Sequence, residues 1–204
     1  MNYTQFQKRV PNVSRETFDN FALYVELVIE YNQKLNLIGK STENDIWERH
    51  IIDSAQLLNF VNIENDTLYD VGSGAGLPGI ILSIAGVKLT YLIESKQKKT
   101  DFLHMASKFS PNEIVIINER VENLTPIKDS VFVCRAFAPL NKIFSLCSNH
   151  IISSKKTIIP KGQNYLDEIA IARKDWSFNF SEHKTITSGE SRILIITNLT
   201  KCKK

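Results

Sequence analysis

The sequence predicts an α/β fold in which a mostly parallel sheet of seven strands is flanked by helices and preceded by a helical extension. Two observations support this prediction. After Asp66, short apolar segments of β type alternate with segments of helical periodicity, which is the pattern of a parallel sheet with connecting helices. The first β-type segment also runs directly into a glycine-rich loop that a helix follows, an arrangement typical of sheets that bind nucleotide-like ligands.

The helical extension is expected to occupy residues 1–62 and to pack on the rest of the chain. Apolar residues at helical spacing predict one helix over residues 14–37, with Ser14 as its N-cap. The same spacing predicts a second helix over residues 43–60, with Thr42 as its N-cap.

Each of these helices carries a pair of polar residues that share one face. Asn32 and Asn36 are four residues apart, and His50 and Asp53 are three apart. We interpret His50 and Asp53 as a structural hydrogen-bonded pair that fixes its helix against the rest of the chain, and Asn32 and Asn36 as capping or docking residues, in both cases in preference to substrate contacts.

The main unit, residues 63–204, is expected to contain the whole sheet, and no repeat or linker divides it. The predicted strands cover residues 67–71, 89–94, 113–118, 130–135, 156–160, 176–184 and 193–197. The predicted helices cover residues 78–85, 96–109, 140–151 and 166–173.

Composition restricts the class of protein. A chain of 204 residues with 43% hydrophobic residues can bury one core. It has no signal peptide and no apolar run long enough to span a bilayer, so a cytoplasmic protein without a membrane partner is expected. The three cysteines form no CxxC pair and the four histidines are scattered, so neither a disulfide framework nor a metal is expected. The net charge of +3 is compatible with a polyanionic partner without identifying one.

The glycine-rich loop predicts a binding site for a nucleoside-type cofactor. Glycines such as Gly72 and Gly74 let the backbone turn sharply and approach a ligand, and the following helix presents free N–H groups. Glu94 ends the second strand about 20 residues further on, where a carboxylate accepts hydrogen bonds from ribose hydroxyls.

The spacing of this loop distinguishes between two cofactors. The loop has the pattern GxGxG, and Leu77 stands where the dinucleotide pattern GxGxxG needs its third glycine. This resembles motif I of class I, or Rossmann-like, methyltransferases. Asp70 could supply the negative charge that favours the sulfonium and ammonium groups of S-adenosyl-L-methionine. NAD binding is the less favoured alternative, because little chain remains for a substrate domain.

Further segments extend the resemblance over nearly the whole chain. They are YNQKLNLI from Tyr31, RHIIDS from Arg49, DVGSGAGLPG from Asp70, ESKQKK from Glu94, RVEN from Arg120, CRAFAPL from Cys134 and PKGQ from Pro160. Together they resemble the bacterial 16S rRNA guanine-N7 methyltransferase family, also called glucose-inhibited division protein B.

The resemblance implies an activity and a cofactor site. The family methylates N7 of guanine 527 in 16S ribosomal RNA, which implies a partner in the small ribosomal subunit or its assembly intermediate. Its S-adenosylmethionine site falls on Gly72, Leu77, Val121, Glu122 and Arg135 of this sequence.

Methylation of guanine N7 places few chemical demands on the protein. N7 carries an in-plane lone pair and no proton, so alignment matters more than acid–base chemistry, and no catalytic residue is assigned. Arg135 could hold the methionine carboxylate, a phosphate or guanine O6, or it could form a surface ion pair. Phe137 could stack on a flipped base or belong to the core.

Basic residues around the expected cleft are candidates for RNA contact. The substrate candidates are Arg49, Arg120, Phe137 and Lys161. Lys96, Lys98 and Lys99 could join them or form a solvated helix face, and the terminal Lys201, Lys203 and Lys204 are expected to be a disordered tail with a weak electrostatic role. A monomer is expected. Two other functions stay open, namely a methyltransferase for another RNA or a small molecule and a non-catalytic cofactor-binding, RNA-binding module.

Overall fold

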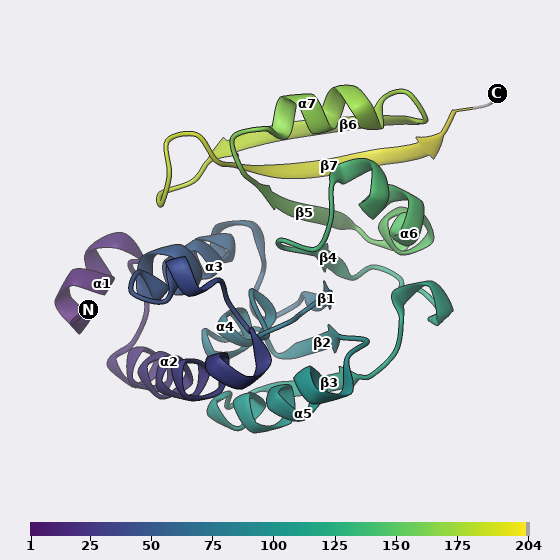
Figure 1. The fold of residues 1–204 in the computed structure, drawn as a ribbon. Helices are drawn as coiled ribbons and strands as arrows, with labels where there is room; N and C mark the ends of the chain where they lie inside the picture. The colour runs from purple at the N-terminus through teal and green to yellow at the C-terminus, as the bar shows by residue number, and fades with distance from the viewer. Residues whose placement is uncertain (203–204) are drawn as a thin grey trace.

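A computed structural model describes residues 1–202 of the chain and contains one seven-stranded sheet of order β3-β2-β1-β4-β5-β7-β6 (Figure 1). Strands β1 to β5 run parallel, and β7 lies antiparallel between β5 and β6. The strands are β1 (Thr67–Val71), β2 (Leu89–Ile93), β3 (Glu113–Ile117), β4 (Val131–Val133), β5 (Lys156–Lys161), β6 (Trp176–Lys184) and β7 (Arg192–Lys201). The predicted sheet of seven mostly parallel strands is confirmed.

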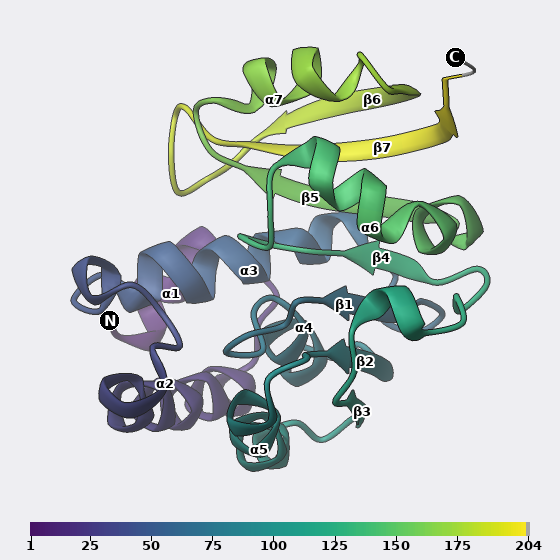
Figure 2. The same cartoon turned by 45° about the vertical axis from the view of Figure 1, so that its right-hand side comes forward.

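Helices connect and cover these strands. The α-helices are α1 (Tyr3–Arg9), α2 (Arg15–Leu35), α3 (Asp53–Ala55), α4 (Gly79–Ile84), α5 (Gln97–Ala106), α6 (Leu140–Ser153) and α7 (Tyr165–Ala172). The other helical segments are the π-helix η2 (Trp47–Ile52) and the 3₁₀-helices η1 (Lys40–Thr42), η3 (Gln56–Phe60), η4 (Ser107–Phe109) and η5 (Val121–Asn123). Figures 1 and 2 show α6 and α7 beside the half of the sheet that contains β5, β6 and β7.

Alternate residues of the central strands enter different cores. Leu68 and Val131 pack into a cluster with η3 and α4, whereas Tyr69 and Phe132 pack into a cluster with α6 and α7. This period of two buries both faces of the sheet. The arrangement leaves the carboxyl ends of β1 to β5 on one edge of the sheet, where open α/β sheets bind ligands.

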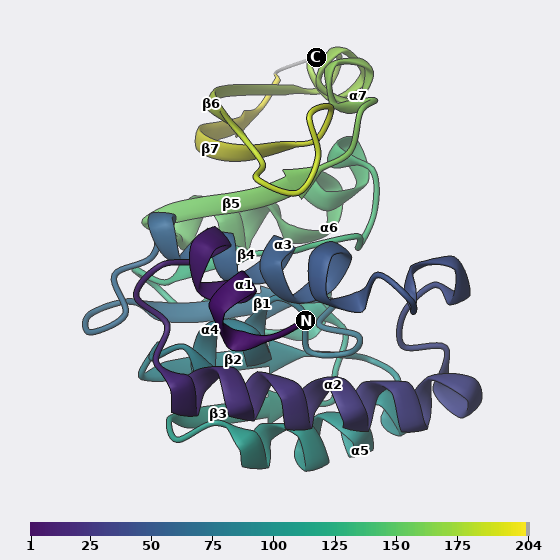
Figure 3. The ribbon, with the colours of Figure 1, turned by 90° about the vertical axis from the view of Figure 1, so that its left-hand side faces the viewer.

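The N-terminal helices share a core with the sheet's own helices. Figure 3 views the molecule from the side on which α1, α2 and α3 lie. One buried cluster contains Phe6, Phe18 and Phe21 from α1 and α2 together with Ile80 of α4 and Phe102 of α5. The burial of these aromatic side chains stabilises the contact of α1 and α2 with α4 and α5.

Polar residues cap α2 as the sequence predicts. The Ser14 side chain accepts a hydrogen bond from Thr17 N, and Asn36 ends the helix in the left-handed region at φ 48°. Asn32 is buried, and its side chain donates to Glu43 (2.7 Å) and accepts from Ile38 N (2.9 Å). The interpretation of Asn32 and Asn36 as capping and docking residues is confirmed.

Three expectations were wrong. The segment 43–60 is not one regular α-helix, because its turns are a π-helix (η2), a short α3 and the 3₁₀-type η3. Thr42 does not cap it, since its hydroxyl donates to the carbonyl of Gly39, the residue before η1. The last strand extends to Lys201, which is therefore not part of a tail, while Lys203 and Lys204 lie outside the described residues.

No helix in residues 1–202 is both long and apolar enough to cross a membrane. Within the same residues, no group of three His, Cys, Asp or Glu side chains is arranged to hold a metal ion.

Candidate cofactor and substrate site

The glycine loop turns at the carboxyl end of β1. Gly72, Gly74 and Gly76 all have positive φ, at 71°, 58° and 89°, a region that residues with a Cβ rarely occupy. The N–H groups of Gly72 and Ser73 donate to Ile93 O at 2.9 and 3.1 Å, which anchors the loop to the end of β2. The side of the loop that faces the sheet is therefore anchored, and the opposite side can contact a ligand.

Glu94 fixes the same loop from the end of β2. One carboxylate oxygen accepts from Gly74 N (3.1 Å) and the other from Lys96 N (2.8 Å), and the residue is 8% exposed. The carboxylate borders the cavity described next. It thus stands where the sequence predicts a ribose-binding acid.

A cavity of about 690 Å³ opens above the carboxyl ends of β1 to β4. It brings together most of the predicted cofactor residues and several RNA candidates. The predicted residues that line it are Gly72, Gly74, Leu77, Glu94, Arg120, Val121, Glu122, Arg135 and Phe137, with Lys96 and Lys99 at its edge. Its volume lies within the range of sites for drug-sized ligands and cofactors.

Asp70 lies behind the glycine loop. It is fully buried, its Oδ2 accepts from Gly79 N (2.9 Å), and its Oδ1 has no partner within residues 1–202. Burial raises the pKa of this carboxyl to about 7. Since Asp70 does not line the cavity, the structure does not bring its carboxylate to the ligand face, and its contact with Gly79 supports the start of α4.

Phe137 lies directly on the glycine loop. A Cβ built on Gly72 would approach Phe137 Cδ2 to 2.3 Å, so the ring excludes any side chain from that position. Phe137 follows Ala136, which has a positive φ of 52°. This turn after β4 directs the ring toward the cavity that Gly72 borders.

Arg135 faces the N-terminal helical segment. Its guanidinium donates to Arg49 O (3.2 Å), Asp53 Oδ2 (3.3 Å) and His50 Nδ1 (3.1 Å). An arginine can only donate, so Nδ1 is the acceptor and Nε2 carries the proton that faces Thr42 Oγ1 at 2.8 Å. His50 and Asp53 therefore dock their helical turns on the segment after β4 through Arg135, as the sequence predicts, but within residues 1–202 no hydrogen bond joins the two side chains to each other.

A second cavity, of about 430 Å³, lies beside the first. The two cavities share Arg135, Ala136 and Ala138 in their walls. Two of the RNA candidates, Arg49 and Lys161, line the second cavity. Lys161 is mostly committed within the protein, because its ammonium group donates to Ala138 O (2.8 Å) and pairs with Glu168 (2.7 Å).

Two residues that support the walls of the first cavity were not predicted from the sequence. The Tyr24 hydroxyl on α2 donates to Ala75 O in the glycine loop (2.7 Å), and His150 Nε2 on α6 donates to Val121 O (2.9 Å). Each side chain belongs to a helical apolar face, so only the position of a partner distant in sequence reveals its role.

Tyr24→Phe is expected to destabilise the protein by about 1–3 kcal/mol, because it leaves the Ala75 carbonyl without its buried donor. Urea unfolding followed by circular dichroism measures the change. Tyr31→Phe is the matched control on the same helix, since Tyr31 is only partly buried. Equal stability of both variants would show that the hydroxyl does not hold the loop.

Glu94→Ala is expected to weaken S-adenosylmethionine binding by about 1–3 kcal/mol through loss of a partly buried hydrogen bond. Titration calorimetry gives the affinity, and Glu113→Ala, an exposed position on β3, is the control. A folded Glu94→Ala protein with wild-type affinity would remove Glu94 from the site.

His50 gives the protein a defined sensitivity to acid. Burial, followed by the charges of Arg135 and Arg49, lowers its pKa from 6.5 to about 4. The unfolded chain binds this proton more readily than the folded protein. The contribution of neutral His50 to the free energy of unfolding is therefore fully present above pH 6.5 and is lost as pH falls toward about 4. Urea midpoints of the wild type and His50→Gln, compared at about pH 7 and about pH 5, should show a smaller acid-induced loss in the variant.

The sheet order, the glycine loop after β1 and the acidic residue Glu94 after β2 are typical of a class I methyltransferase that uses S-adenosylmethionine. The family model described as "GidB: rRNA small subunit methyltransferase G" matches residues 17–196. The chain belongs to this family and is a methyltransferase.

Named relatives agree with the family match. The chain is 46% identical over 190 residues to ribosomal RNA small subunit methyltransferase G of Rickettsia bellii, covering 93% of this chain and 98% of the relative. It is 44% identical over 189 residues to the protein of the same name from Rickettsia akari, with coverage of 93% and 98%.

Solved structures share the fold at low sequence identity. The ribosomal protein L11 methylase of Lactobacillus delbrueckii subsp. bulgaricus has a TM-score of 0.56 at 15% identity, with 72% of this chain and 76% of that chain covered. The M. jannaschii TYW2 structure in complex with AdoMet has a TM-score of 0.51 at 14% identity, with 76% and 77% covered.

Proposed function

We propose that this protein transfers the methyl group of S-adenosylmethionine to N7 of guanine 527 in 16S ribosomal RNA. We also propose that the protein is a monomer and acts in the cytoplasm on the small ribosomal subunit or its assembly intermediate. The observation that carries it is the cavity bordered by Gly72 and Glu94, in a chain of the small-subunit methyltransferase G family. RNA as the substrate class follows from that family.

The residues around the cavity support a role in binding and alignment. S-adenosylmethionine supplies an electrophilic methyl group when bound. The glycine loop can approach it closely, and the Glu94 carboxylate can accept hydrogen bonds from its ribose. The N7 lone pair needs no deprotonation, so the protein has to hold the base in line with the methyl group.

The basic side chains around the cavity support an RNA substrate. Arg49 and Arg120 are exposed at the rims of the two cavities, and Lys96 and Lys99 border the first. Cations placed in this way neutralise phosphates and make binding dependent on salt concentration.

Methyl transfer to small ribosomal subunits tests the proposal. Subunits from cells that lack this gene are incubated with the protein and tritiated S-adenosylmethionine, and the product is mapped by cleavage at N7-methylguanine. Label at one guanine is the expected result. Label only on another RNA or a small acceptor would identify that molecule as the substrate in place of 16S ribosomal RNA. Cofactor binding without transfer to any acceptor would indicate a non-catalytic module.

A further inference from the structure

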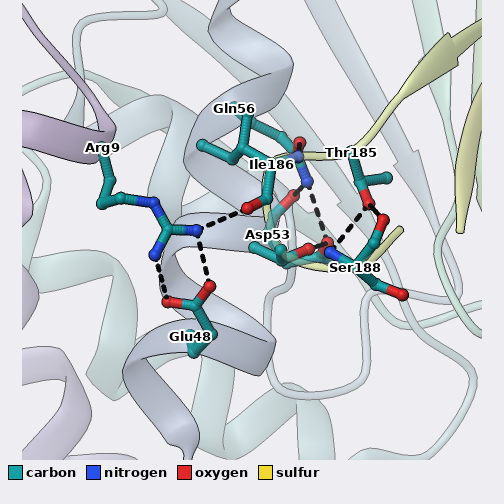
Figure 4. A network of polar contacts seen from close by, with 8 residues as sticks. Arg9, Glu48, Asp53, Gln56, Thr185, Ile186 and Ser188 are labelled. Carbon is teal, nitrogen blue, oxygen red and sulfur yellow. Dashed lines mark hydrogen bonds and ion pairs between the residues drawn. The ribbon is translucent and has the colours of Figure 1, made fainter. Parts of the chain in front are cut away.

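The loop between β6 and β7, residues 185–191, is tied to the N-terminal helices (Figure 4). Arg9 on α1 pairs with both carboxylate oxygens of Glu48 (3.1 and 2.7 Å) and also donates to Ile186 O. On the other side of the same residue, Ile186 N donates to Gln56 Oε1 (2.9 Å). Both backbone polar groups of Ile186 are therefore held by side chains more than a hundred positions away in the sequence.

Further polar contacts fix the shape of this loop. Thr187 Oγ1 donates to Asp53 Oδ1 (2.7 Å), and Thr185 Oγ1 donates to Ser188 O (2.7 Å). The side chain of Ile186 contributes little apolar burial, since this residue is 43% exposed. The loop is thus held by directional hydrogen bonds, which set position more strictly than hydrophobic packing does.

This loop forms one wall of the second cavity. Thr185, Thr187, Ser188 and Ser191 line that cavity together with Arg49 and His50 of η2. Pro160 and Lys161 at the end of β5 supply another wall. The cavity therefore lies at the carboxyl ends of β4 and β5, on the far side of Arg135 from the glycine loop.

The charge of the second cavity favours an anionic ligand. Arg135 is neutralised by Asp53, and Lys161 by Glu168. Arg49 is exposed at the wall and forms no side-chain ion pair within residues 1–202. An arginine side chain can bind a phosphate group with two hydrogen bonds.

We propose that the second cavity receives the acceptor nucleotide of the RNA, with its phosphate at Arg49, and that Arg9 is a positioning residue for the cavity wall. This proposal rests on the proposed function. A nucleotide held here reaches the first cavity across Ala136 and Ala138, which border both. Arg9 acts through Ile186 O, because that hydrogen bond sets how closely the 185–191 loop approaches the nucleotide.

Methylation kinetics of Arg9→Ala test the positioning role. The full-length variant should show a KM for small ribosomal subunits raised about tenfold, with S-adenosylmethionine affinity unchanged. Arg15→Ala is the matched control, because the contacts of Arg15, an exposed ion pair with Asp19 and a cation–π contact with Tyr3, do not involve the 185–191 loop. An unchanged KM in Arg9→Ala, with an active wild type, would overturn the positioning role alone.

A charge-reversed pair separates positioning from general stability. Arg9→Glu combined with Glu48→Arg restores the ion pair, but a glutamate carboxylate cannot donate to Ile186 O. We expect the urea midpoint to return toward wild type while KM stays raised. Recovery of KM together with stability would show that Arg9 has no role beyond stability.

Crosslinking locates the nucleotide independently of turnover. Small subunits carrying 6-thioguanosine at the acceptor position are irradiated with the S-adenosylhomocysteine-loaded protein, and crosslinked peptides are identified by mass spectrometry. Peptides containing residues 185–191 or Arg49 are expected. Crosslinks confined to α5 would place the nucleotide elsewhere and overturn the proposal. If wild-type protein transfers no methyl group, the proposed function fails, and the crosslink on bound RNA still decides the location.

Discussion

Gly72→Asp is expected to weaken S-adenosylmethionine binding by more than about 100-fold, or about 3 kcal/mol. Three effects add. The backbone at Gly72 has φ +71°, a Cβ there would meet Phe137 Cδ2 at 2.3 Å, and the new carboxylate would occupy the space above the glycine loop. Titration calorimetry with S-adenosylmethionine measures the loss directly.

The control for Gly72→Asp is Gly189→Asp, because a Cβ on Gly189 meets nothing within 4 Å and its φ is ordinary. Its cofactor affinity should equal that of the wild type. If Gly72→Asp does not fold, Gly72→Ala is compared with Gly72→Ala combined with Phe137→Ala, which removes the colliding ring. Wild-type affinity in folded Gly72→Asp would mean that the cofactor does not approach this loop.

Phe21→Ala is expected to destabilise the protein by about 3–5 kcal/mol. The Phe21 ring is fully buried and packs against Phe6 with ring centroids 5.6 Å apart, in the cluster that also contains Ile80 and Phe102. Removing the ring leaves a cavity where the N-terminal helices meet α4 and α5. Urea unfolding monitored by circular dichroism gives the change in free energy.

Leu23→Ala on the same helix is the control for Phe21→Ala, since Leu23 is 46% exposed and should change stability by less than about 0.5 kcal/mol. Both proteins should unfold in one transition. The division of the chain at residue 62 stays a prediction from the sequence. Two separate unfolding transitions would indicate that residues 1–62 fold as an independent unit.

Most of the fold could be predicted because strands buried on both faces produce distinctive apolar segments. The bounds of β1, a strand of this kind, agree residue for residue with the sequence prediction, and those of β6 agree although this edge strand is mostly exposed. The helix α1 went unrecognised because its seven residues include a single buried one, Phe6, which is too few to form a periodic pattern. The π-helix η2 was missed because the same apolar spacing serves several hydrogen-bond registers.

The cofactor site could be predicted where it depends on short motifs at the ends of consecutive strands. The loop spacing and the parallel topology are sufficient to predict that Gly72 and Glu94 lie close together. The directions of Arg135 and Lys161 depend instead on partners such as Asp53 and Glu168, which are brought close only by the folded chain. No local pattern encodes such distant contacts.

The guanidinium of Arg135 has a thermodynamic consequence because it borders both cavities. If a ligand in one cavity shifts this side chain, the free energy of that shift changes the affinity of the other cavity for its own ligand. Linkage then requires the effect to be reciprocal, so the factor by which cofactor changes RNA affinity equals the factor by which RNA changes cofactor affinity. One side chain, docked on His50 and Asp53, would make the two binding equilibria heterotropically cooperative.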